Sequence, residues 1–87
     1  MRIVFSPHAV VQMELRGGTE AEVRSAIREG ERQAARLGRT AFRKNFSYQA
    51  QWKGRYYETK QVMPVVVEEN DTFVIVTVYV FYFGGEA

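Results

Sequence analysis

The chain of 87 residues contains no cysteine and only one histidine. The absence of cysteine excludes disulfide bridges, thiolate zinc sites and a thiol nucleophile, and it favours a reducing compartment. One histidine and scattered carboxylates give no spacing typical of metal ligands, so we expect no metal site. The sequence also has no glycine-rich loop for phosphate groups, and we expect no cofactor.

Long hydrophobic runs are also missing. The C-terminal apolar run, residues 72–83, is too short to cross a bilayer as a helix, and the N-terminus has no apolar signal-peptide core. We therefore expect a cytoplasmic protein without a membrane segment. The length predicts a single domain, residues 1–87, and a chain this short buries only about 60–65% of its extended surface. Any functional site should then be a surface groove.

Acidic residues are scarce in the middle of the chain. Residues 32–60 contain eight basic residues and one acidic residue, a net charge of +7, whereas residues 1–31 carry −1 and residues 61–87 carry −4. Such a block is typical of a surface that binds nucleic acid or another anionic partner. A block of this size is equally compatible with a solvated surface, and charge alone leaves both interpretations open.

The strongest pattern is the C-terminal stretch of residues 72–83, in which β-branched and aromatic residues fill both alternating sets of positions. One set contains Val74, Val76, Val78 and Val80, and the other contains Phe73, Ile75, Tyr79, Phe81 and Phe83. This composition predicts a central strand. Residues 62–69 have the same character, and Asn70 and Asp71 between the two runs predict an antiparallel hairpin.

The first third of the chain predicts two helices. Ser6 and Pro7 form a typical helix start, and Gly17 and Gly18 end that helix. We expect its apolar side to contain Val10, Val11, Met13 and Leu15, and its polar stripe to contain His8, Gln12 and Arg16. A capping box of Thr19 and Glu22 starts a second helix, which Gly30 closes.

These signals predict an α+β fold with two N-terminal helices on one face of a mainly antiparallel, four-stranded sheet. The helices are expected at residues 7–16 and 19–29, and the strands at residues 2–5, 39–48, 56–68 and 72–83. Residues 31–38 are expected to form a charged connection, and residues 49–54 a loop that carries Trp52. Pro64 removes a donor from its strand, so we expect a nearby edge, bulge or gap in pairing.

The order of these motifs resembles a small prokaryotic family of unknown function whose members begin His-Ala-x-x-Arg-Met-x-x-Arg-Gly-Ile, and which is grouped with the RelE, ParE and BrnT toxins. The matching residues are His8-Ala9, Met13, Arg16-Gly17, Thr19, Glu22-Val23, Ile27 and Val76-Thr77-Val78-Tyr79. Gln12 stands where the family usually has arginine, and Gly18 where it has isoleucine. The resemblance covers nearly the whole chain and implies a RelE-like fold.

Three residues are candidates for catalysis. His8 is the only side chain whose unperturbed pKa lies near neutrality, so it could transfer a proton during RNA cleavage while Arg16 holds the phosphate. Lys60 joins them because RelE-like ribonucleases, as the resemblance implies, act through arginines, lysines and a tyrosine on one sheet face. The alternative for His8 is a structural contact in the first helical turn.

The candidates for nucleic-acid binding come from the basic middle third. They are Arg39, Arg43, Lys44, Trp52 and Arg55, with several tyrosines nearby that could stack bases. We expect one shallow groove to contain His8, Arg16, Arg39, Arg43 and Lys60. The alternative is that Arg39 and Arg43 only solvate the outer face of an edge strand and prevent aggregation.

Two classes of function follow. The first is a toxin of a toxin–antitoxin module that binds messenger RNA, either on the ribosome or free, and acts as a metal-independent endoribonuclease. The second is a non-catalytic interaction module on the same fold, either with ParE-like binding of a protein target or as an inactive relative. The apolar faces of the hairpin predict a covering partner, either a cognate antitoxin or, for the chain alone, a second copy in a homodimer.

Overall fold

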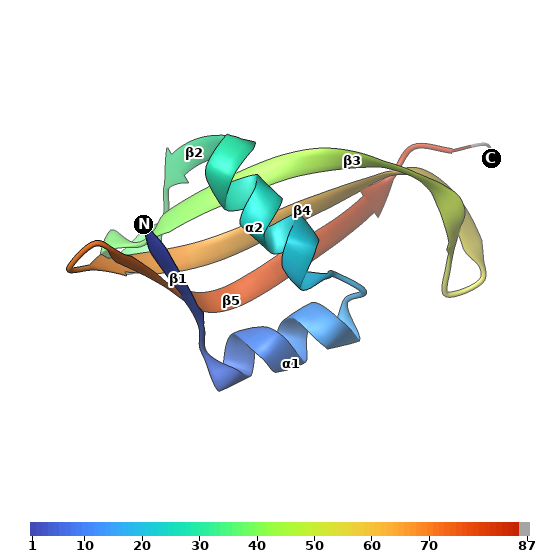
Figure 1. The fold of residues 1–87 in the computed structure, drawn as a ribbon. Helices are drawn as coiled ribbons and strands as arrows, with labels where there is room; N and C mark the ends of the chain where they lie inside the picture. The colour runs from blue at the N-terminus through green and yellow to red at the C-terminus, as the bar shows by residue number, and fades with distance from the viewer. Residues whose placement is uncertain (86–87) are drawn as a thin grey trace.

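The computed structural model describes residues 1–85, in which two helices cover one face of a five-stranded mixed sheet (Figure 1). In chain order the elements are β1 (Arg2–Phe5), α1 (Pro7–Leu15), α2 (Glu20–Glu29), β2 (Glu31–Ala34), the short 3-10 helix η1 (Arg36–Gly38), β3 (Thr40–Trp52), β4 (Arg55–Glu69) and β5 (Thr72–Phe83). The strand order is β1-β5-β4-β3-β2. The predicted α+β class and both predicted helices are confirmed.

The predicted sheet of four mainly antiparallel strands is wrong in two respects. The residues expected as a charged connection form β2, which pairs with β3, and β1 runs parallel to β5. All four residues of β2 are exposed, so its sequence has no alternating apolar pattern to reveal it. Pairing with β3 stabilises this strand instead. Helix lengths and strand patterns also do not specify which strand β1 joins.

The predicted loop at residues 49–54 is largely strand. β3 continues to Trp52, and only Lys53 and Gly54 turn the chain, with φ angles of 52° and 83°. Two residues with positive φ make a tight hairpin turn that matches the twist of the strands. The Asn70-Asp71 hairpin turn is confirmed, and both residues again have positive φ, 48° and 62°.

The helix caps form as the sequence predicts. The Ser6 hydroxyl accepts a hydrogen bond from the Ala9 N–H, and Thr19 and Glu22 form both bonds of the capping box. These contacts satisfy backbone N–H groups that have no partner within their helices. None of the helices in residues 1–85 combines the length and the apolar character needed to cross a bilayer.

The predicted apolar side of α1 needs a correction. Ala9 and Met13 are the buried residues of α1, whereas Val11 and Leu15 are 51% and 65% exposed. The reason is the packing of α1 against β5, which brings the small Ala9 side chain onto the sheet and turns Val11 outward. The predicted polar stripe also divides, because His8 is exposed while Gln12 and Arg16 are half-buried.

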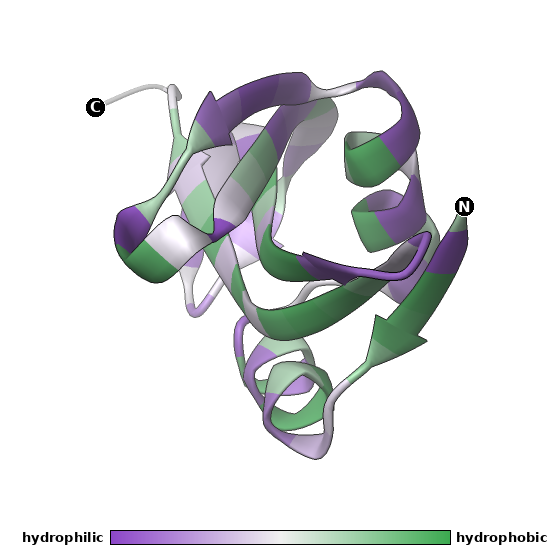
Figure 2. Ribbon diagram, turned by 90° about the vertical axis from the view of Figure 1, so that its left-hand side faces the viewer, coloured by the Kyte–Doolittle hydropathy of each residue, from purple (hydrophilic) through white to green (hydrophobic). Residues whose placement is uncertain are grey.

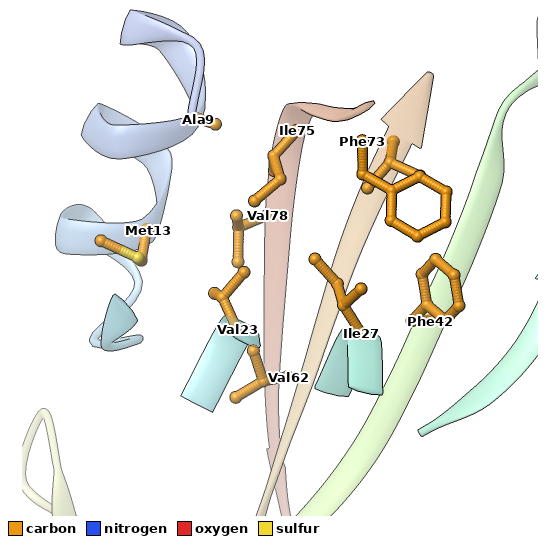
Figure 3. Packing of buried hydrophobic residues seen from close by; sticks show 10 residues of the cluster. Ala9, Met13, Val23, Ile27, Phe42, Val62, Phe73, Ile75 and Val78 are labelled. Atoms are coloured by element: carbon orange, nitrogen blue, oxygen red, sulfur yellow. The ribbon is translucent and has the colours of Figure 1, made fainter. Parts of the chain in front are cut away.

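The core lies between the helices and the sheet. Figure 3 shows residues of both helices facing residues of β3, β4 and β5, and the members that it labels are Ala9, Met13, Val23, Ile27, Phe42, Val62, Phe73, Ile75 and Val78. Figure 2 shows apolar residues along the strands that lie beside the helices. Burial of these side chains provides the main free energy of folding, at about 25 cal/mol for each Å² of apolar area.

A β-bulge in β5 changes which side chains point toward the helices. Val65 pairs with Thr77, and the next residue of β4, Val66, pairs with Ile75, so Val76 is an extra residue. The alternation shifts there. Ile75 and Val78 therefore both point inward, and the predicted grouping of Ile75 with Tyr79 on one face is wrong. Pro64 lies beside this bulge and in a gap of the β3–β4 pairing, as predicted.

Candidate functional site

The face of the sheet opposite to the helices, called the open face below, carries a groove of about 470 Å³. Its floor comes from β3, β4 and β5, and the segment of β2 and η1 forms its wall. The residues that line it are Gln33, Ala34, Ala35, Arg36, Leu37, Arg39, Ala41, Met63, Val65, Thr77 and Tyr79. A groove of this volume is within the usual range for a small ligand, about 300–1,000 Å³.

Two arginines border the groove. Within residues 1–85, no carboxylate forms a salt bridge with Arg36 or Arg39. Between them Leu37 has a φ of 60° and is 83% exposed. The positive φ turns the chain back so that the Ala35 N–H donates to the Arg39 carbonyl at 2.8 Å. This bend holds both arginines beside the apolar floor of the groove. Their guanidinium groups can bind phosphate or carboxylate oxygens there through two N–H groups.

Arg43 and Lys44, by contrast, have acidic partners. The Arg43 guanidinium contacts Glu31 Oε1 at 2.5 Å and 3.0 Å, and Lys44 Nζ contacts Glu29 and the Ser25 hydroxyl. The hydrogen bond from Lys44 lowers the pKa of Glu29. Much of the positive charge predicted for β3 is therefore compensated within the protein.

Arg16 lies at the end of α1 and reaches β5. Its Nη1 donates to the Val78 carbonyl at 2.8 Å, and its Cζ lies 5.0 Å from the centre of the Tyr79 ring. β1 pairs with β5 only over residues 72–75. Val78 lies beyond this range, so its carbonyl has no partner on β1, and the hydrogen bond from Arg16 satisfies it. Arg16 thus touches a residue that lines the groove, although it does not line the groove itself.

His8 lies apart from the other predicted site residues. It is exposed in the first turn of α1, eight residues before Arg16, which corresponds to about 12 Å along a helix. α1 packs on β5, and β4 separates β5 from β3, so two strand spacings of about 10 Å in total lie between β5 and β3. The structure therefore does not bring His8 together with Arg39 and Arg43.

Lys60 is buried, with 5% of the residue exposed. Its Nζ donates to the Gly17 carbonyl at 2.6 Å, forms a salt bridge with Glu22 at 2.8 Å and lies 5.6 Å from the centre of the Tyr48 ring. These contacts join β4 to the turn between the helices. The ammonium group is occupied by internal partners and lies away from the groove.

Trp52 and Arg55 lie at the far end of the β3–β4 hairpin. The Trp52 ring stacks on Tyr82, with centres 5.0 Å apart and planes at 15°, and both rings pack against Gly17. Arg55 lies over the Tyr57 ring at 5.9 Å. Trp52 is therefore half-buried in a cluster of aromatic rings rather than displayed in a polar loop.

Tyr82 holds this cluster to α1. Its hydroxyl donates to the Arg16 carbonyl at 2.8 Å. Burial raises the pKa of Tyr82 from 10.0 to about 12, and the nearby Tyr48 and Glu22 contribute to the increase. Because the unfolded chain releases this proton first, near pH 10, Tyr82 stabilises the fold below pH 10, and this contribution is lost as the pH rises toward about 12.

We expect the Tyr82 phenol to ionise near pH 12, because its neutral form is buried and hydrogen-bonded. The measurement is the difference in phenolate absorbance between the wild type and Tyr82→Phe over an alkaline titration, with circular dichroism to follow the fold. Tyr79, which is 40% exposed, provides the control through Tyr79→Phe. A difference step for Tyr82 at the ordinary value of about 10 would contradict the burial of its hydroxyl against α1.

The sequence prediction included one of the residues that line this groove, Arg39. It missed Arg36, because the surrounding residues were interpreted as a connection rather than as a strand and a bend over the sheet. Tyr79 was placed in the predicted C-terminal strand but not in a site. The signal that could have identified it is the spacing of Tyr79, Phe81 and Phe83, which predicts three aromatic side chains on one strand face.

Comparison with known protein families gives a match over most of the chain. The sequence profile of a family described as a domain of unknown function (DUF4258) matches residues 5–80. No curated protein and no solved structure matches the chain. The matched range begins at the end of β1 and continues into β5, so it contains both helices and the complete groove.

Proposed function

We propose that this chain, which belongs to the DUF4258 family of domains of unknown function, is a RelE-like toxin that binds RNA on the open face and cleaves it. The observation that carries the proposal is the groove in which Arg36 and Arg39 border Tyr79. The resemblance to RelE-like ribonucleases implies a site of this kind, with arginines and a tyrosine on one face of the sheet.

The chemistry required is transesterification of RNA. Solvent water takes the proton of the ribose 2′-hydroxyl, whose oxygen attacks the neighbouring phosphorus to form a 2′,3′-cyclic phosphate. The bond to the 5′-oxygen breaks, and water supplies a proton to that departing oxygen. Negative charge accumulates on the phosphate oxygens in the transition state. Arginines held beside an apolar surface stabilise that charge, because they remain protonated and bind oxygens through two N–H groups. The Tyr79 hydroxyl supplies a hydrogen bond to the phosphate or the 2′-oxygen.

The proposal includes a cellular setting. The protein would act in the cytoplasm, and a cognate antitoxin would neutralise it by covering the open face. Without that partner the exposed side chains of β5 would favour a homodimer, since a two-fold contact needs only the chain itself.

The second candidate function is a non-catalytic module that binds a protein, in the manner of ParE toxins. Two observations favour it: Lys60, Arg43 and Lys44 are engaged by internal carboxylates, and β5 exposes Tyr79, Phe81 and Phe83. Overexpression in a bacterial host separates the two functions. Growth arrest with loss of RNA supports the endoribonuclease, arrest with DNA damage supports a ParE-like module, and unimpaired growth supports an inactive relative.

We expect the double variant Arg36→Glu/Arg39→Glu to bind RNA at least about 100-fold more weakly than the wild type, because hydrogen bonds to charged groups contribute about 1.5–3 kcal/mol each. The measurement is fluorescence anisotropy with a labelled RNA at several salt concentrations, and the variant should also show a smaller salt dependence.

The matched control is Arg2→Glu/Arg28→Glu, which changes the net charge equally. Arg2 and Arg28 are exposed, lie outside the groove and form no salt bridge within residues 1–85. This control should retain most of the affinity. Equal losses in both double variants would mean that the net charge, and not the groove, attracts RNA.

A further inference from the structure

Two aromatic rings stand side by side on the open face, next to the groove. Tyr79 and Phe81 are 40% and 44% exposed, their ring centres are 6.2 Å apart, and their planes are nearly parallel at 12°. Phe83, two residues further along β5, is 43% exposed and continues the row. This row of three residues is called the aromatic row below.

The distance between the two rings is slightly shorter than a flat ligand between them requires. Stacked bases lie about 3.4 Å apart, so a base held between two rings requires about 6.8 Å between their planes. The ring centres of Tyr79 and Phe81 are 6.2 Å apart, which is the largest separation that their nearly parallel planes can have. The rings must therefore open by at least about 0.6 Å to admit a base, and both can adjust on their exposed sides. Side chains two residues apart on a strand are separated by about 6.6–6.8 Å, so the spacing follows directly from the β-conformation.

Positive charge surrounds one end of the aromatic row. Arg16 lies 5.0 Å from the Tyr79 ring, and Arg36 and Arg39 line the groove to which Tyr79 also belongs. The row itself, together with the rest of residues 72–83, carries no charge. The combination of stacking surfaces with adjacent arginines is typical of sites for single-stranded nucleic acid.

We propose that the aromatic row binds the unpaired bases of single-stranded RNA, with one base between Tyr79 and Phe81 and the backbone phosphate next to it on Arg36 and Arg39. The inference rests on the proposed function and specifies its substrate class. Double-stranded RNA is excluded from this mode, because its bases are paired and stacked on one another and cannot enter between the rings.

The test compares an eight-nucleotide labelled oligoadenylate with a blunt RNA duplex of the same length in fluorescence anisotropy. The wild type should bind the single strand at least tenfold more tightly than the duplex. Phe81→Leu should lose about tenfold or more of its affinity for the single strand, since leucine keeps the apolar character and removes the ring. Phe81→Tyr restores a ring and should restore binding.

Tyr56→Leu is the matched control, because Tyr56 is also 43% exposed but lies on β4 outside the groove and the aromatic row. This variant should bind the single strand like the wild type. The melting temperatures of all variants are measured to confirm that they fold.

Several results would overturn the inference. Base stacking is rejected if Phe81→Leu binds the single strand with wild-type affinity, or if the wild type binds duplex and single strand equally. In either case the proposed function survives if Arg36→Glu/Arg39→Glu still loses affinity for RNA. If the wild type binds no RNA at all, both proposals fail. If Phe81→Leu instead converts a dimer into a monomer in light scattering and leaves RNA affinity unchanged, the row serves a second copy of the chain.

Discussion

Replacing Gly30 by alanine should destabilise the fold by about 3 kcal/mol or more, because the added methyl group meets backbone on two sides. An ideal Cβ would lie 2.4 Å from the Ala26 carbonyl oxygen and 2.6 Å from that of Arg43. Neither atom belongs to a side chain that could rotate away. The end of α2 or the first part of β3 would have to move, because Gly30 lies against both.

Chemical unfolding measures this loss, and a thermal melt should show a decrease of about 12–24 °C, since one kcal/mol corresponds to about 4–8 °C in a domain of this size. Gly18→Ala is the control: its Cβ would meet side-chain atoms of Val80 and Met13 at 3.2 and 3.3 Å, which can shift. We expect a loss below about 1 kcal/mol there. Equal losses at both positions would show that Gly30 is not specifically crowded.

Lys60→Met should have an effect of similar size, about 3 kcal/mol, because removal of one partner of a buried ion pair leaves the other charge without compensation. The Glu22 side chain is 22% exposed and would lose its ammonium partner, and the Gly17 carbonyl would lose its donor. Methionine keeps the apolar stem, so the loss reports on the charge and the hydrogen bonds rather than on packing.

Two further variants sharpen this experiment in chemical unfolding. Lys44→Met removes the partner of Glu29, whose side chain is 63% exposed, and should cost much less stability than Lys60→Met because water screens the pair. Glu22→Gln in the Lys60→Met background should recover part of the stability, because the amide is neutral and its oxygen can still accept the Thr19 N–H. A loss at Lys60 no larger than at Lys44 would show that burial does not strengthen the Lys60 contacts.

Most of the elements that could be predicted from the sequence depend on contacts between residues close together in the chain. The caps at Ser6 and Thr19 and the turn at Asn70-Asp71 depend on contacts within a few residues, so their patterns are visible in the chain itself. β2 depends instead on pairing with β3, and the parallel position of β1 depends on β5. Those contacts join residues far apart in the sequence, and no local pattern encodes them.

The same distinction applies to the candidate site. The sequence indicated that residues 32–60 carry excess positive charge, but not which arginines face a carboxylate. Arg43 lies opposite Glu31 because β2 pairs with β3, whereas the bend at Leu37 places Arg36 and Arg39 at the groove. Whether an arginine pairs with a carboxylate or remains available at the groove therefore depends on β2 and the bend after it, which the sequence did not predict.

The bulge at Val76 also has an evolutionary consequence. Because Ile75 points inward and Thr77 outward on either side of the extra residue, a chain that lost Val76 would regain a regular strand and keep Tyr79 on the open face. Loss of Val74 would instead force Ile75 to the opposite side of the sheet. Related chains that differ in length by one residue in β5 are therefore expected to differ at Val76, where a deletion leaves both the core and the aromatic row in place.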